Sequence, residues 1–139
     1  NVLSLLESDF IEICTSITDG TLDKVDVRFS TKATVCKYAV PEGYPDNPIK
    51  GEPIDVSKIK NHCRLFYASV DFKGTALVEA GSRTIAVVGI ADTISEAETI
   101  AEKEVLSISG PLFHRTDIGT NAAIQKRIEH MKKLKRESI

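Results

Sequence analysis

An apolar stretch followed directly by a helix start signal organises the second half of this chain. Residues 83–91 are mostly apolar, which is typical of a strand in the interior of a sheet. Thr93 and Glu96 then form a capping box, in which each side chain accepts a hydrogen bond from a backbone N–H group at the helix start. The helix that follows has one apolar face, made of Ile94, Ala97, Ala101, Val105 and Ile108. The sequence therefore predicts a central strand that leads into a helix packed on the sheet.

The spacing of apolar and turn residues predicts the other elements. A helix is expected over residues 1–20, where apolar side chains recur every three or four positions before Asp19-Gly20. Alternating residues predict strands over 25–29, 66–72 and 76–80, and a more uniformly apolar run predicts a strand over 33–40. The strands over 66–72 and 76–80 would form an antiparallel meander with 83–91, and a short strand is expected within 112–119. A last helix is expected over 121–136. Residues 1–139 are thus predicted to form one α+β domain, a single antiparallel sheet with helices packed on it.

Length and composition agree with this architecture. The chain has 139 residues, of which 42% are hydrophobic and 27% charged, as in an ordinary globular domain. Cys14, Cys36 and Cys63 are widely spaced, which suits core thiols in a reducing compartment. The sequence has neither a signal peptide pattern nor an apolar run of about 20 residues, so we expect a cytoplasmic protein. It opens with Asn1 rather than Met, which we interpret as a piece cut from a longer polypeptide.

The formal charge of −2 is distributed unevenly. Lys126 to Ile139 contain six Lys or Arg and two Glu, a charge of +4, so the rest of the chain carries −6. A basic tail on an acidic body could bind a nucleic acid or a protein, and such a non-catalytic binding module is the alternative function. A solvated helix face is the plainer interpretation, and the tail lacks the interleaved aromatic residues that stack on bases.

Motifs for independent catalysis are missing. The sequence contains no GxxxxGK[ST] or GxGxxG phosphate motif and no HExxH metal motif. The three histidines, His62, His114 and His130, are scattered and are interpreted as ordinary surface or satisfied residues. We therefore predict no catalytic residue and no metal ligand.

Three loop segments place polar or aromatic side chains where a ligand could bind. A long proline-rich loop presents Tyr44 and Lys50. A tight turn at Gly81-Ser82-Arg83 combines a guanidinium with exposed backbone N–H groups. Arg115 and Asp117 lie two residues apart, so on an extended segment they share a face and Asp117 could hold Arg115 toward an anion. Ordinary turns and surface ion pairs produce the same residue types, and that is the plainer interpretation.

A series of short motifs runs through nearly the whole chain: Leu5-Leu6-Glu7-Ser8-Asp9, Ala33-Thr34-Val35-Cys36, Gly43-Tyr44-Pro45, Lys50-Gly51-Glu52-Pro53-Ile54, Ala80-Gly81-Ser82-Arg83, Asp92-Thr93-Ile94-Ser95-Glu96-Ala97 and Arg115-Thr116-Asp117-Ile118-Gly119. In order and spacing, the series resembles the C-terminal domain of the phosphoribosylamine–glycine ligases, which belong to the ATP-grasp superfamily. Two departures stand out. The family's Phe-His-Ala-Gly-Thr is Phe66-Tyr67-Ala68-Ser69-Val70 here, and its Gly-Gly-Arg is Gly81-Ser82-Arg83.

The resemblance implies a part of a purine-biosynthesis ligase that activates glycine with ATP and Mg or Mn and joins it to 5-phosphoribosylamine. In this family the nucleotide and metal groups lie upstream, so the fragment alone would bind neither and would be inactive. Its partners would be the missing N-terminal and ATP-grasp domains of the same chain, with no nucleic acid and no membrane. Residues 1–20 would lead in from the central region, and residues 121–139 would form a basic C-terminal helix.

The resemblance also implies substrate-binding residues. The domain would form one wall of the active site and help to hold the ribose phosphate, because a guanidinium beside turn amides suits a dianion. The substrate-binding residues would be Arg83, Ser82, Arg115, Asp117, Tyr44 and Lys50.

Overall fold

Strand β5 (Ile85–Ala91) lies inside a four-stranded antiparallel sheet with the order β2-β5-β1-β6. It pairs with β1 (Ala33–Pro41) on one side and with β2 (Arg64–Tyr67) on the other. The short strand β6 (Leu112–Phe113) extends the sheet beyond β1. The structure is a computed structural model that describes residues 1–60 and 64–137. The predicted central position of the apolar strand is confirmed.

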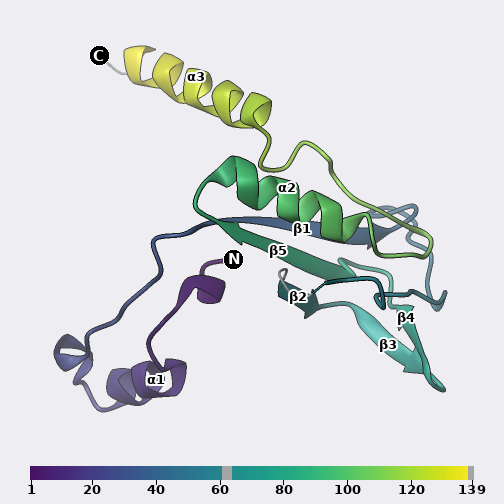
Figure 1. Cartoon of the computed structure of the whole chain (residues 1–139), viewed down its shortest axis with the longest axis horizontal. Coiled ribbons are helices and arrows are strands. Elements are labelled where there is room, and N and C mark those ends of the chain that lie inside the picture. Colours follow the sequence, from purple (N-terminus) through teal and green to yellow (C-terminus); the bar gives the residue numbers. More distant parts are fainter. Residues whose placement is uncertain (61–63, 138–139) are drawn as a thin grey trace.

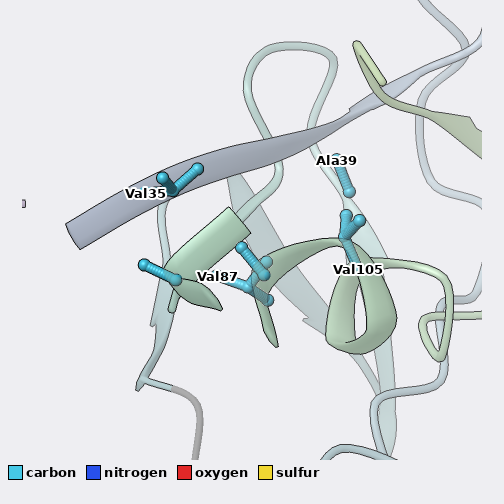
Figure 2. Packing of buried hydrophobic residues seen from close by; sticks show 6 residues of the cluster. Val35, Ala39, Val87 and Val105 are labelled. Carbon is cyan, nitrogen blue, oxygen red and sulfur yellow. The ribbon is translucent and has the colours of Figure 1, made fainter. Parts of the chain in front are cut away.

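Helix α2 (Ile94–Val105) covers one face of this sheet along β1 and β5 (Figure 1). Its capping box is formed, because the Thr93 hydroxyl accepts from the Glu96 N–H group at 3.2 Å and the Glu96 carboxylate accepts from the Thr93 N–H group at 3.1 Å. Helix and sheet bury one apolar cluster, part of which is labelled in Figure 2: Val35, Ala39, Val87, Ala97, Ala101 and Val105.

A glycine on β5 allows the helix to lie this close to the sheet. A Cβ atom added to Gly89 would lie 2.0 Å from the Ala97 carbonyl oxygen and 2.9 Å from the Ala101 nitrogen. Both are backbone atoms of α2, so neither can move aside without shifting the helix. The sheet and α2 together give the antiparallel α+β architecture that the sequence predicts.

The predicted three-stranded meander is wrong in its pairing. Strands β3 (Val70–Lys73) and β4 (Ala76–Glu79) form a separate two-stranded sheet, and β5 pairs with β2 instead of β4. The predicted strand over 66–72 breaks at Ala68-Ser69, whose N–H groups donate to the carbonyls of Thr84 and Arg83 at 3.0 and 2.9 Å. These bonds hold the chain beside the start of β5 before it turns away into β3.

The helix expected over residues 1–20 is shorter than predicted. A 3-10 turn covers Leu3–Leu5, the chain is extended at Leu6, and α1 covers Phe10–Thr18. Asp9 starts α1, because its carboxylate accepts from the N–H groups two and three residues ahead at 2.7 and 3.0 Å. The apolar residues over 1–20 therefore keep a helical spacing although the chain does not form one continuous helix, because Asp9 caps a new helix in the middle of the pattern.

Residues 1–31, here called the N-terminal segment, fold back on themselves and project from the sheet (Figure 1). The Glu7 N–H group donates to Arg28 at 3.0 Å, and the Ser30 N–H group donates to Leu5 at 2.8 Å. The strand predicted over 25–29 is wrong, since the described residues there make a single bridge, between Leu6 and Phe29.

Helix α3 (Asn121–Glu137) confirms the predicted last helix and extends away from the sheet (Figure 1). Across residues 1–60 and 64–137, the chain contains no helix with the length and apolar character needed to cross a membrane. The core role expected for the cysteines is wrong for Cys14, which is exposed, and for Cys36, which is half-buried outside the core cluster. Cys63 and His62 lie outside the described residues.

Candidate functional site

The two faces of β1 have different roles. Val35, Lys37 and Ala39 are buried on the face that α2 covers. The alternate residues, Cys36, Tyr38 and Val40, line a pocket of about 450 Å³ on the other face, as the pleat of a strand requires. The complete lining is Cys36, Tyr38, Val40, Tyr44, Pro45, Arg83, Phe113, Arg115 and Ile118.

This pocket brings together one residue from each of the three predicted segments. Tyr44 comes from the proline-rich loop, Arg83 from the turn before β5, and Arg115 from the segment after β6. Three aromatic rings and two guanidinium groups thus share one cavity, and none of the described residues that line it is a carboxylate. Such a lining suits a ligand with a sugar or ring body and an anionic group.

Lys50 and Ser82 lie beside the pocket and do not line it. The Lys50 side chain lies against Gly81, where an added Cβ would come within 2.4 Å of the lysine Cε atom. Gly81 also has a φ angle of +89°, which favours glycine. The Lys50 side chain leaves little room there for a Cβ atom. Ser82 is exposed, and its carbonyl accepts from the Thr84 hydroxyl at 3.1 Å. The turn is therefore held by contacts on both sides of Arg83.

Arg115 and Asp117 form a bidentate ion pair. The Arg115 Nε and Nη2 atoms donate to the two Asp117 carboxylate oxygens at 2.9 and 2.6 Å. This pair raises the pKa of Arg115 and lowers the pKa of Asp117, so both groups stay charged near neutral pH. Asp117 faces a neighbouring groove, which Arg115 also lines together with Ala123, Lys126, Arg127, His130 and Met131.

The pocket does not supply a nucleophile or a metal site. Burial raises the pKa of the Cys36 thiol above its ordinary value of 9.0, so the thiol is protonated at neutral pH. Within residues 1–60 and 64–137, no group of three or more His, Cys, Asp or Glu side chains is placed to hold a metal ion. The arrangement can bind and orient an anion.

Sequence reasoning missed a buried ionic cluster on the opposite face of β1. The Lys37 side chain is 0% exposed, and its Nζ atom donates to Glu98 at 2.7 Å and Glu102 at 2.5 Å. His114 lies 3.1 Å from Glu102. The sequence does contain a signal for this cluster. A lysine occupies the apolar face of a predicted strand, and the helix predicted to pack on that sheet carries two glutamates four residues apart. His114 is thus a satisfied residue, as expected.

Comparisons with known proteins agree with the motif series. Residues 34–121 match the family model described as phosphoribosylglycinamide synthetase, C domain. The chain is 51% identical over 139 residues to the phosphoribosylamine–glycine ligase of Methanocaldococcus jannaschii, covering 98% of this chain and 31% of that protein. It is 52% identical over 135 residues to the ligase of the same name from Methanosarcina barkeri, covering 97% and 31%.

A solved structure shows the same fold. The crystal structure of phosphoribosylamine–glycine ligase from Thermotoga maritima matches with a TM-score of 0.58 at 23% identity, over 76% of this chain and 27% of that one. The chain spans about 31% of the length of the curated relatives described above. With the family model covering residues 34–121 and these relatives matching nearly the whole chain, the chain belongs to the phosphoribosylglycinamide synthetase C-domain family.

Proposed function

We propose that this chain is the C-terminal domain of an ATP-dependent ligase that joins glycine to 5-phosphoribosylamine in purine biosynthesis. The relatives that it resembles over nearly its whole length are named phosphoribosylamine–glycine ligases. The domain would form one wall of the active site and hold the substrate phosphate. ATP and its Mg or Mn ion would be held by upstream domains of the intact protein.

The meeting of Arg83 and Arg115 in one pocket carries this proposal. Among the described residues Arg83 forms no ion pair, so its guanidinium is free to meet an anion. Arg115 is already oriented by Asp117. A phosphate dianion would meet two planar donors there, and Tyr44 could lie against the ribose. Ser82 and Lys50 would support the turn that carries Arg83.

The N-terminal segment supports a partner within the same polypeptide. Eight of its large apolar side chains are exposed: Val2, Leu3, Phe10, Ile11, Ile17, Leu22, Val27 and Phe29. The family model starts at residue 34, beyond this segment, yet the relatives match almost the whole chain. Exposed apolar groups at this density usually mark an interface. We propose that the upstream ATP-grasp domain covers them, and that residues 1–139 otherwise form one domain.

The test is steady-state kinetics on the full-length protein with Arg83→Ala. Loss of a charge-assisted contact should raise KM for phosphoribosylamine by about 10- to 100-fold. KM for ATP should stay within about twofold, because the proposed contact is to the other substrate. Lys73→Ala, which removes an exposed cation from β3, is the matched control and should change neither constant. Equal effects of Arg83→Ala on both substrates would reject the phosphate role.

A further inference from the structure

The ammonium group of Lys37 joins three parts of the fold. Lys37 lies in the middle of β1, and its Nζ atom donates to Glu98 and Glu102 on α2. Its third acceptor is the backbone carbonyl of Thr116, at 3.1 Å. An ammonium group has three donors, so the geometry satisfies all of them. The strand, the helix and the segment after β6 are thereby fixed to one buried atom.

The segment that carries Arg115 is tied down on both sides. On one side, the His114 ring lies 3.1 and 3.2 Å from the two Glu102 carboxylate oxygens. On the other side, the Thr116 carbonyl accepts from Lys37. Arg115 lies between these two anchors and lines the pocket on the opposite face of the sheet. Its backbone is therefore held from the α2 side, and its guanidinium is held by Asp117.

Lys37 and Glu102 remain ionised near neutral pH. Burial opposes the charge on Lys37, but the hydrogen bonds to Glu102 and Glu98 outweigh it, and the pKa of Lys37 is raised. Burial likewise opposes the charge on Glu102, but the bonds to Lys37 and His114 outweigh it, and the pKa of Glu102 is lowered. A buried ion pair is weak evidence of stabilisation, because burying the two charges costs their hydration and replacing such a pair by apolar side chains of similar size is often neutral or stabilising. Stability alone does not account for a lysine at this position.

We propose that Lys37 is a positioning residue for substrate binding: it holds the backbone between Arg115 and Asp117 so that the Arg115 guanidinium points into the pocket. This inference rests on the proposed function for its kinetic consequence. Its structural consequence, an ordered 114–117 segment, is independent of the substrate.

The kinetic test is a double-mutant cycle in the full-length protein. Lys37→Met should raise KM for phosphoribosylamine by about three- to tenfold, with KM for ATP unchanged, because Arg115 loses its fixed direction. On an Arg115→Ala background, Lys37→Met should have no further effect on that KM, since the side chain it positions is gone. Effects that multiply across the cycle would overturn the proposal.

Val87→Ala is the matched stability control. Val87 is 0% exposed in the same core cluster and pairs with Lys37, and its strand β5 is separated from β6 by β1. This substitution should destabilise the domain and leave KM for phosphoribosylamine unchanged. An equal rise in KM for Val87→Ala and Lys37→Met would reduce Lys37 to a stability residue and reject the proposal.

Hydrogen exchange separates a failure of this inference from a failure of the proposed function. Backbone amides of residues 112–120 should exchange at least about tenfold faster in Lys37→Met, and not in Val87→Ala. Unchanged exchange would reject the positioning role. If Arg115→Ala leaves KM unchanged while exchange rises as expected, the substrate assignment fails and the structural role of Lys37 stands. Should Lys37→Met fold poorly, the variant Lys37→Met with Glu98→Gln removes a carboxylate left without its ammonium partner and keeps the contact between Glu102 and His114. The same exchange criterion applies to it.

Discussion

Apolar side chains are buried in the sheet that α2 covers, whereas many of them are exposed in the N-terminal segment. In the sheet, Ile85 and Val87 are 0% exposed, whereas in the N-terminal segment Phe10 and Ile11 are 51% and 70% exposed. Both regions form helices with a side-chain cap and satisfy backbone groups by hydrogen bonds. Local hydrogen bonds therefore define the backbone conformation in both regions. Only in the sheet are the apolar side chains also buried against a neighbouring element. We expect the sheet to be stable by itself and the segment to depend on a neighbouring surface.

The largest effect expected within the sheet comes from Gly89→Ala. The new methyl group would meet the backbone of α2 at 2.0 Å, so the helix must shift, and we expect a loss of about 3 kcal/mol or more in the free energy of unfolding. Gly20→Ala is the control in the N-terminal segment. Its added Cβ meets nothing within 4 Å, and its φ angle of +66° costs about 1 kcal/mol locally. Urea unfolding that ranks the two variants equally would contradict the comparison.

A smaller effect is expected from acid. The pKa of Glu102 is lowered below its ordinary value of 4.5, so the folded state binds fewer protons than the unfolded chain. This contribution to stability is present above pH 4.5 and is lost as the pH falls through the folded pKa. Urea unfolding at pH 7, 5, 4 and 3 should show this loss, and the variant Lys37→Met with Glu102→Gln should show a flatter profile. An identical slope in both proteins would exclude the cluster as its source.

Removing a helix cap should lower the free energy of unfolding more in α2 than in α1. Thr93→Ala removes the cap of α2 and should cost about 1 kcal/mol in global unfolding. Asp9→Ala removes the cap of α1 and should cost less than half as much, because among the described residues the main contacts of α1 are with the 3-10 turn at Leu22–Lys24 and not with the sheet. Denaturation midpoints at a constant m-value measure both. A larger shift for Asp9→Ala would show that α1 belongs to the cooperative core.

The smallest effect is expected for Phe10→Ala in the polypeptide of residues 1–139. Since this ring is 51% exposed, truncation should change the unfolding free energy by less than about 0.5 kcal/mol. In the full-length protein the same substitution should cost about 2 kcal/mol, if the upstream domain buries the ring. Thermal unfolding of both forms makes the comparison. Tyr67→Ala on β2 is the control, because Tyr67 is 55% exposed and its truncation should change the unfolding free energy little in either form.

The sequence predicted best those elements whose signals are local. The apolar run of β5 and the Thr93–Glu96 box stand next to each other in the chain, and both formed as expected. The stripe over residues 1–20 was also a local signal, but it misled because a capping aspartate at position 9 divides it. Periodicity identifies the side a helix would bury, and a cap decides where the helix begins.

Features that depend on distant parts of the chain could not be predicted in this way. The split of the meander follows from Ala68 and Ser69 bonding to the start of β5. The candidate site was predicted as three separate segments, and the structure joins Tyr44, Arg83 and Arg115 in one pocket. Lys37 was passed over, since its partners are about sixty residues or more away along the chain.

The alternation of β1 has a consequence for protein engineering. Along its nine residues, core positions alternate with positions that line the pocket. Randomising Cys36 and Tyr38 would alter the shape of the pocket and leave unchanged the face of β1 on which α2 packs. Under the proposed function, a library directed at new acceptor substrates needs few codons, and its members should survive selection for folding.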